Sequence, residues 1–182
     1  MLREYVAKLG YSVYDWGMGR NFGKMEYMAA LVERLEKIQQ KHDQKVSLIG
    51  WSLGGYIARE CARELTQEVA QVITFGAPII GGPKYSRAAD FFKAKKFDLD
   101  WIEQSIEKRN SKPIQQPITS IYSGSDGEVS ATAAVDEISQ NVKNIEVNGA
   151  HLGMGFNRNI WKLVTDALSA EANNRSKSKQ SL

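Results

Sequence analysis

Short apolar segments alternate along this chain with segments whose apolar residues recur at helical spacing. Four segments have the length and apolar character of buried strands: 45–50, 69–75, 118–122 and 144–147. A helical pattern follows the first of them over residues 53–65, and another closes the chain over residues 160–168. This alternation is typical of a parallel sheet covered by helices. The sequence therefore predicts an α/β fold with a mostly parallel sheet and helices on both faces.

The N-terminal region continues the same alternation. Residues 2–9 carry apolar residues at helical spacing, and Gly10 then ends the pattern. Residues 11–16 alternate enough to predict a further strand, and residues 28–38 predict an amphipathic helix. Between them, the glycine-broken segment GMGRNFG, residues 17–23, predicts a loop.

The length of 182 residues suits one domain, which we assign to residues 1–172. Residues 81–116 are charged and aromatic without strand character, so we expect a helical insertion over the strand ends, a lid or cap. A peripheral helical excursion packed on the core has equal weight, because long insertions take either form. Residues 173–182 place basic residues among Ser and Asn, which predicts a disordered polar and basic tail.

Composition argues against several classes of protein. The formal net charge is only +3, with much of the excess in the tail and no basic stripe, so we expect no nucleic-acid partner. The single cysteine, Cys61, permits no intrachain disulfide, and its helical spacing predicts a buried position. Two distant histidines and no cysteine cluster imply no metal, and no cofactor is expected.

No segment approaches the roughly 18 consecutive apolar residues of a membrane span. The N-terminus MLREYVAKLG also lacks the apolar centre of a signal peptide. These two observations predict a cytoplasmic protein without an integral membrane segment, and they leave the oligomeric state open.

The sequence VSLIGWSLGG, residues 46–55, places a serine where a predicted strand meets a predicted helix. Gly50 and Gly54 stand two positions before and after Ser52, and small residues there allow the strained turn that exposes a serine hydroxyl. The helix that follows offers unpaired backbone N–H groups, including that of Leu53, to a developing oxyanion. Since G-x-S-x-G also occurs by chance in ordinary turns, this interpretation of Ser52 requires a partner base.

A serine nucleophile needs a histidine base held by a carboxylate. His42 lies among charged residues at the end of an amphipathic helix and is expected to be solvated. His151 follows the last predicted strand and Asp126 follows the strand before it, although both are also ordinary loop residues. The order Ser52, Asp126, His151 matches the order of the α/β-hydrolase arrangement. These three residues are therefore the predicted catalytic group.

At this point the chain resembles a bacterial lipase- or esterase-like α/β-hydrolase. The resemblance rests on the segments LREYVAKLGYSVYDWGMGRNFG, VSLIGWSLGGYIARE, VITFGAPIIG, ITSIYSGSDGEVS and IEVNGAHLGMGFNRNIW. It covers nearly the whole chain apart from the insertion and the tail. It implies Ser52 as nucleophile, His151 as general base and then acid, and Asp126 as the residue that orients the imidazole. The implied reaction is hydrolysis of a small-molecule or lipid acyl ester through an acyl-enzyme, and Trp51 is expected to line an apolar pocket.

The resemblance also implies strands that precede Met1, so we expect an N-terminally truncated form of the fold. One such strand would end in an HG-type loop that supplies the second oxyanion donor, and it would lie between segments 11–16 and 45–50. Its absence would leave unpaired backbone edges. Three outcomes follow: an incomplete chain, direct pairing of the two flanking strands, or a strand donated by another chain. Because one lost donor costs about 100- to 1,000-fold in turnover, the activity of this chain stays open.

Two alternatives to a serine esterase remain. The chain could be a catalytically impaired, hydrolase-like binding or structural protein, or a thioesterase or acyltransferase that uses the same three residues. A nucleotide-binding role for the glycine-rich turn is disfavoured, because neither Gly-Lys-Ser/Thr nor a spaced G-x-G-x-x-G is present.

Overall fold

The computed structural model describes residues 1–19, 21 and 26–180. Its centre is a four-stranded sheet made of β1 (Val46–Trp51), β2 (Val69–Phe75), β3 (Ile118–Tyr122) and β4 (Val142–Glu146). Every neighbouring pair is parallel, and the order β1-β2-β3-β4 follows the chain. The carboxyl ends of all four strands therefore meet at one end of the sheet, which is where ligands bind in open α/β sheets.

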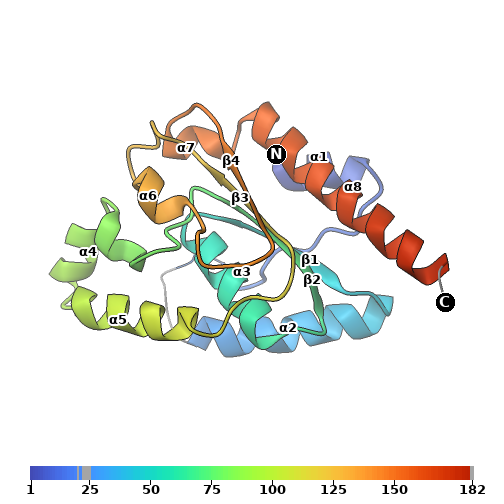
Figure 1. Ribbon diagram of the computed structural model, residues 1–182, viewed down its shortest axis with the longest axis horizontal. Helices are drawn as coiled ribbons and strands as arrows, with labels where there is room; N and C mark the ends of the chain where they lie inside the picture. The colour runs from blue at the N-terminus through green and yellow to red at the C-terminus, as the bar shows by residue number, and fades with distance from the viewer. Residues whose placement is uncertain (20, 22–25, 181–182) are drawn as a thin grey trace.

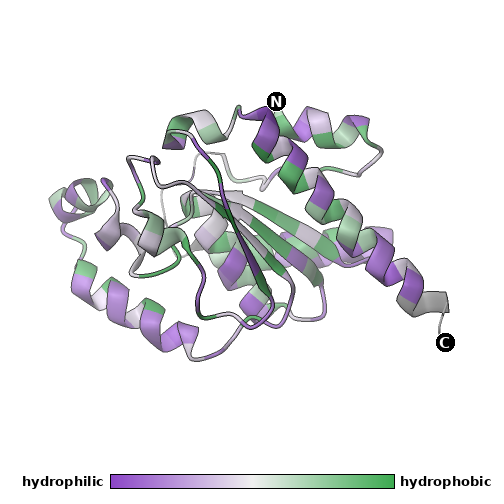
Figure 2. Cartoon of the chain, turned by 45° about the horizontal axis from the view of Figure 1, so that its top comes forward, coloured by the Kyte–Doolittle hydropathy of each residue, from purple (hydrophilic) through white to green (hydrophobic). Residues whose placement is uncertain are grey.

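Helices cover both faces of this sheet (Figure 1). Helices α2 (Glu26–His42) and α3 (Leu53–Glu64) pack on one face, while α1 (Leu2–Lys8) and α8 (Arg158–Gln180) pack on the other. Each face has its own core, and successive residues of β2 supply both: Val72 contributes to the first and Ile73 to the second. Figure 2 shows hydrophobic segments along most of the strands and a mixture of hydrophobic and hydrophilic residues along the helices. The predicted α/β fold with helices on both faces is confirmed.

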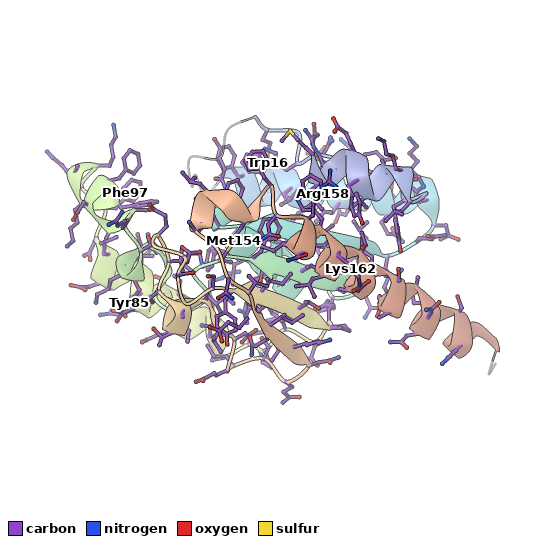
Figure 3. The ribbon with its side chains drawn as sticks, turned by 90° about the horizontal axis from the view of Figure 1, so that it is seen from above. Trp16, Tyr85, Phe97, Met154, Arg158 and Lys162 are labelled. Atoms are coloured by element: carbon purple, nitrogen blue, oxygen red, sulfur yellow. The ribbon has the colours of Figure 1, made fainter. Side chains whose placement is uncertain are left out.

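Shorter helical elements surround the strand ends. The segment between β2 and β3 contains the 3₁₀-helix η1 (Gly82–Tyr85) and helices α4 (Ala89–Ala94) and α5 (Leu99–Asn110). Two further short helices follow strands: α6 (Ala131–Ala134) follows β3, and α7 (His151–Met154) follows β4. Figures 1 and 3 show the α4–α5 insertion projecting at the opposite end of the molecule from the C-terminal end of α8.

The strongest sequence patterns match the structure most closely. Strands β2 and β3 have the predicted bounds, β1 lies one residue later than predicted, and β4 begins two residues earlier. Cys61 is fully buried as expected, and burial raises the pKa of its thiol to about 12. Part of the predicted loop at 17–23 lies outside the described residues.

The prediction of a strand at residues 11–16 is wrong, because this segment has no strand pairing in the structure. Its side chains instead bind α2. The Tyr14 hydroxyl lies 2.7 Å from His42 Nε2, Arg34 bonds Asp15, and the Trp16 ring packs edge-on against Tyr27. These contacts hold the segment without a backbone ladder. Within the described residues, β1 is an end strand of the sheet and the segment 11–16 does not pair with it.

The prediction of a disordered tail is also wrong over residues 173–180, because helix α8 continues to Gln180. Arg175 explains the extension: its Nε bonds Glu171 one turn earlier at 3.0 Å, and its Nη1 donates to the Lys45 carbonyl at 3.2 Å. Residues 181–182 lie outside the described part. No helix within that part combines the length and apolar character that a bilayer crossing requires.

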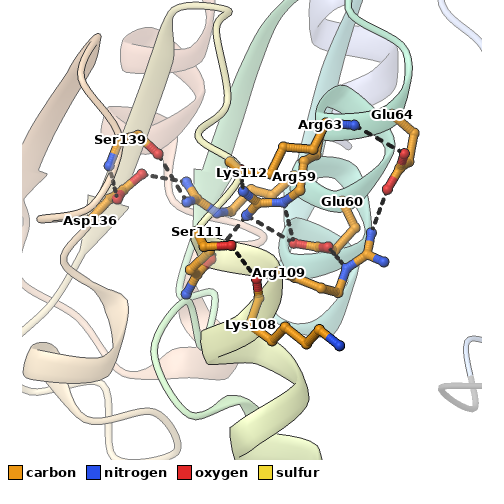
Figure 4. Close-up of polar contacts among 11 residues, drawn as sticks. Arg59, Glu60, Arg63, Glu64, Lys108, Arg109, Ser111, Lys112, Asp136 and Ser139 are labelled. Carbon is orange, nitrogen blue, oxygen red and sulfur yellow. Dashed lines mark hydrogen bonds and ion pairs between the residues drawn. The ribbon is translucent and has the colours of Figure 1, made fainter.

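Helix α3 buries charged residues that connect it to two other parts of the chain (Figure 4). Arg59, only 2% exposed, donates to Asp136 at 2.6 Å in the segment after α6. Burial alone would raise the pKa of Asp136, but the Arg59 guanidinium and hydrogen bonds from Ser139 outweigh burial and hold that pKa below its usual value. The pair therefore stays ionised in the core and fixes the orientation of α3 against the segment between α6 and β4.

A second group of charges joins α3 to the last turn of α5. Glu60 accepts hydrogen bonds from Arg63 and from Arg109 of α5, and Arg109 also bonds Glu64 at 3.0 Å. Arg63 in turn donates to the Asn110 side chain at 2.9 Å. The C-terminal end of the insertion is thus held on the helix that begins beside Ser52.

We predict that Arg59→Met lowers the free energy of unfolding by about 3–5 kcal/mol, because Asp136 would remain buried without its counter-ion. Urea unfolding followed by circular dichroism measures this change. The control is Lys162→Met, which removes an ion pair of similar length, 2.7 Å, between exposed side chains and should change stability little. Equal effects of the two substitutions would contradict a special role for the buried pair.

Candidate active site

Ser52 occupies the turn between β1 and α3 and is the N-cap residue of α3. Its backbone has φ 54° and ψ −129°, a conformation that residues with a side chain rarely adopt and that costs on the order of 1–3 kcal/mol. Neighbouring elements hold it there: the Ser52 N–H donates to the Phe75 carbonyl at 3.0 Å, and the Gly55 N–H donates to the Ser52 carbonyl at 2.9 Å. The side chain is partly exposed, so a substrate can reach its hydroxyl.

The glycines that allow this turn differ in part from those predicted. A Cβ on Gly50 would lie 2.4 Å from the Gly54 carbonyl oxygen, so Gly50 is required as predicted. A Cβ on Gly54 would meet nothing within 4 Å, so the space around Gly54 does not require glycine. The second sterically required glycine is Gly55, whose Cβ would lie 2.7 Å from that of Ala77. The spacing of the motif therefore identified the glycine required at position 50 but not the one at position 55.

Asp126 and His151 meet directly at the carboxyl end of the sheet. Asp126 lies in the loop after β3, and His151 is the first residue of α7 after β4. The distance between His151 Nδ1 and Asp126 Oδ2 is 2.8 Å, and the His151 N–H also donates to the Asp126 carbonyl at 2.8 Å. The other carboxylate oxygen accepts the N–H groups of Glu128 and Val129. A proton on Nδ1 facing this fixed carboxylate leaves Nε2 available as a base.

Ser52 lies at the same end of the sheet without bonding this pair. Among the described residues no hydrogen bond joins the Ser52 hydroxyl to His151, and catalytic hydrogen bonds are often long before substrate binds. The residue before it, Trp51, connects the two parts: its ring lies 5.7 Å from the His151 ring and stacks on Phe75 at 6.2 Å. Trp51 thus packs against the imidazole, and its expected contact with substrate stays a prediction.

Gly76 is a site residue that the sequence analysis missed. It follows β2 directly, with φ +56°, and a Cβ on it would lie 3.0 Å from His151 Nδ1 and 3.1 Å from Asp126 Oδ2. Only glycine leaves the histidine and carboxylate their full space at this strand end. The available signal was a glycine immediately after a mostly apolar strand, in VITFGAP.

The turn supplies one candidate oxyanion donor. Leu53 is the first residue of α3, so its backbone N–H has no acceptor within the helix. The same helix end carries the positive side of the helix dipole, which favours a negative charge beside Ser52. The sequence-based choice of Leu53 is therefore consistent with the geometry of the helix start.

A family model described as lecithin:cholesterol acyltransferase matches residues 7–122, a span that includes Ser52 but neither Asp126 nor His151. A comparison with curated proteins finds no match.

Three solved structures illustrate the structural likeness. One represents the metagenome-derived lipolytic enzymes LipS and LipT, at 14% identity and a TM-score of 0.68, covering 94% of this chain and 86% of that chain. An α/β superfamily hydrolase from Oenococcus oeni has 17% identity and a TM-score of 0.59, covering 81% and 74%. The mature Bacillus licheniformis lipase has 16% identity and a TM-score of 0.53, covering 65% and 64%. The chain thus spans less than two thirds of that lipase, and at these identities the likeness shows a shared fold.

We predict that Gly50→Ala and Gly54→Ala have different effects on stability. Gly50→Ala forces a methyl group into the backbone of α3 and should lower the free energy of unfolding by about 3 kcal/mol or more. Gly54→Ala enters open space in a helix and should change it by less than about 1 kcal/mol. Denaturant unfolding of both variants provides the test, and comparable losses would show that the close approach at Gly50 is not limiting.

Proposed function

The chain belongs to the lecithin:cholesterol acyltransferase family and has an α/β-hydrolase fold, and from this premise we propose that it hydrolyses carboxylic esters with Ser52 as nucleophile. The observation that carries the proposal is the 2.8 Å contact between His151 and Asp126, beside the strained turn at Ser52. The lipase and esterase names of the structural neighbours support an ester as substrate, of either a small-molecule or a lipid kind.

The proposed mechanism follows from the position of each group. His151 Nε2 accepts the hydroxyl proton as Ser52 Oγ attacks the ester carbonyl carbon. The negative charge that develops on the carbonyl oxygen is stabilised by the Leu53 N–H and the start of α3. His151 then protonates the departing alcohol, which leaves an acyl group on Ser52. In the second half, His151 takes a proton from water as the water oxygen attacks the acyl carbon. His151 then returns this proton to Ser52 Oγ as the bond from Oγ to the acyl group breaks and the acid leaves.

Asp126 contributes by holding the imidazole in one orientation and tautomer. Its carboxylate is itself fixed by the N–H groups of Glu128 and Val129, so the histidine does not need to be reordered during the reaction. The positive charge on His151 after the first proton transfer lies beside this carboxylate, which lowers the energy of the charged intermediate.

The family description favours a second candidate, acyl transfer to an alcohol. The same acyl-enzyme serves both reactions, and they differ only in whether water or an alcohol attacks it. A hydrolase-like protein without catalysis is the remaining alternative. A reactive Ser52 is expected for hydrolysis and for transfer to an alcohol, but not for a protein without catalysis.

We predict that a fluorophosphonate probe labels the wild-type protein and the Ser111→Ala control but not Ser52→Ala. Hydrolysis of short p-nitrophenyl esters should fall by about 10³-fold or more in Ser52→Ala, because the nucleophile is lost. Added alcohol acceptors would reveal an ester product if acyl transfer competes with hydrolysis. A folded wild-type protein that is neither labelled nor faster than Ser52→Ala would refute the enzyme proposal and support a binding protein.

We also propose that residues 81–116 form a cap over the strand ends whose two parts differ in mobility. The last turn of α5 is held on α3 through Arg109 and Arg63, and α5 buries Leu99 and Ile106. Helix α4 has no buried residue. The 3₁₀-helix η1 is tied to α5, because Lys84 pairs with Asp100 and the Tyr85 hydroxyl donates to Glu103. Movement of the cap would therefore be confined to α4.

Hydrogen exchange tests this division of the cap. Amides of α4 should exchange faster than those of the last two turns of α5, because α4 lacks buried contacts and ionic anchors. Exchange at the end of α5 should rise in Arg109→Met, which removes its bonds to Glu60 and Glu64. Equally slow exchange across residues 81–116 would identify the segment as a fixed excursion packed on the core.

A further inference from the structure

Trp51 is connected to both the nucleophile and the base of the candidate site. It is the last residue of β1, and the peptide bond after it leads directly to Ser52. The centroid of its indole lies 5.7 Å from the centroid of the His151 ring, and the two planes meet at 36°. Aromatic rings in contact have centroids about 4.5–7 Å apart. A shift of this indole therefore changes the position of the imidazole relative to Ser52.

The indole is itself held by neighbouring elements. Phe75, its partner across the β1–β2 ladder, stacks on it at 6.2 Å with 13° between the planes. The backbone of Gly155, directly after α7, reaches the benzene part of the indole, because a Cβ on Gly155 would lie 3.2 Å from Cζ3 of Trp51. The Trp161 Nε1–H of α8 donates to the Gly155 carbonyl at 3.1 Å. The position of the indole is thus defined by β2 and by the turn that α8 holds.

Asp126 fixes only one side of the His151 ring. The 2.8 Å contact of Nδ1 with the Asp126 carboxylate and the bond from the His151 N–H to the Asp126 carbonyl both lie on that side. The proposed base is the other ring nitrogen, Nε2, which forms no hydrogen bond within the part of the chain that the structure describes. A hydrogen bond tolerates bending before it weakens, so the ring can still tilt about Nδ1 and move Nε2. A flat ring packed against the imidazole limits this tilt.

The indole N–H takes no part in this arrangement. Trp51 Nε1 is buried, and no described residue accepts a hydrogen bond from it. A buried donor without a partner is unfavourable, and its burial also keeps it from a bound substrate. The contribution of Trp51 is therefore its aromatic face, which phenylalanine also provides. This makes Trp51→Phe the conservative substitution and Trp51→Leu the disruptive one.

We propose that Trp51 is a positioning residue that keeps His151 Nε2 directed at the Ser52 hydroxyl. This inference rests on the ester hydrolysis proposed above, and it assigns Trp51 to the orientation of the base in place of the substrate pocket. A displacement of a reacting group by about 1 Å costs about 100-fold in rate. Because the indole does not contact the substrate in this role, its loss lowers kcat and leaves KM nearly unchanged.

Steady-state kinetics on short p-nitrophenyl esters test the assignment. Trp51→Leu should lower kcat by about 100-fold and change KM by less than about threefold. Trp51→Phe should keep kcat within about fivefold of the wild type, because an aromatic face remains beside the imidazole. An unchanged kcat in Trp51→Leu would overturn the proposal. A rise in KM alone would also overturn it and would place the ring in the substrate pocket.

Two glycines at α7 test whether the effect passes through the indole. Gly155→Ala places a methyl group 3.2 Å from Trp51, whereas a methyl group on Gly153 in the same helix meets nothing within 4 Å. Gly155→Ala should lower kcat by about tenfold, and the matched control Gly153→Ala by less than about twofold. Combined with Trp51→Leu, Gly155→Ala should have no further effect, because the contact that it disturbs is then absent. Independent losses in the double variant would contradict a route through the indole.

A measurement without substrate reports the position of the base directly. Nuclear magnetic resonance relaxation of ring-labelled histidine measures the mobility of the imidazole, and the chain contains only two histidines. The His151 ring should be rigid in the wild type and in Trp51→Phe, and should lose order in Trp51→Leu. His42, which contacts Tyr14, is the internal reference and should not change.

The failure of this inference can be told apart from the failure of the proposed function. An active wild type with an equally rigid His151 ring in all variants would overturn the role of Trp51 alone. An inactive wild type would refute ester hydrolysis and this inference with it. All variants are compared after circular dichroism confirms that they are folded.

Discussion

The close approach of β1 to α3 at Gly50 is the constraint on which the rest of the site depends. The chain reverses there within a few residues, because no Cβ separates the end of the strand from the backbone of Gly54 and Gly55. This leaves Ser52 with a positive φ that its own side chain disfavours. The strain persists because both flanking elements are held independently: β1 by its ladder to β2, and α3 by the buried pair of Arg59 and Asp136.

Parallel topology then explains why residues so distant in the sequence meet. In a parallel sheet the loops that follow the strands all lie at the same end. The loops of Asp126 and His151 are therefore neighbours, although the two residues are far apart in the sequence. Strand β2 lies between β1 and β3, and its terminal Gly76 keeps that strand end free of side-chain atoms beside Asp126 and His151. The site thus requires two different contributions from glycine, a sharp turn at Gly50 and an empty volume at Gly76.

The accuracy of the sequence-based predictions follows from where the deciding information lies. Both ends of β2 were predicted correctly. This strand is buried on both faces, and such burial requires the mostly apolar run that the sequence shows. Residues 11–16 have a strand-like pattern, but strand formation also needs a neighbouring edge, and the side chains of Tyr14 and Asp15 bind α2 instead. The helix at 173–180 depends on the contact of Arg175 with Lys45, which no local pattern contains. Likewise, the order of Ser52, Asp126 and His151 indicated a site, whereas the requirement for glycine at Gly55 depends on its contact with Ala77, which only the folded structure shows.

The insertion combines a fixed base with an exposed tip, and the position of its anchor has a mechanical consequence. Arg109 holds the end of α5 on Glu60 and Glu64, which belong to the same helix that presents Ser52 at its other end. The C-terminal end of the insertion is therefore fixed relative to the turn at Ser52 through a single helix. Because Glu60 is buried, its pair with Arg109 is screened by salt less than an exposed pair such as Lys162 with Asp166. Salt should thus weaken the exposed ion pairs of the surface before it loosens the insertion from the helix that begins beside Ser52.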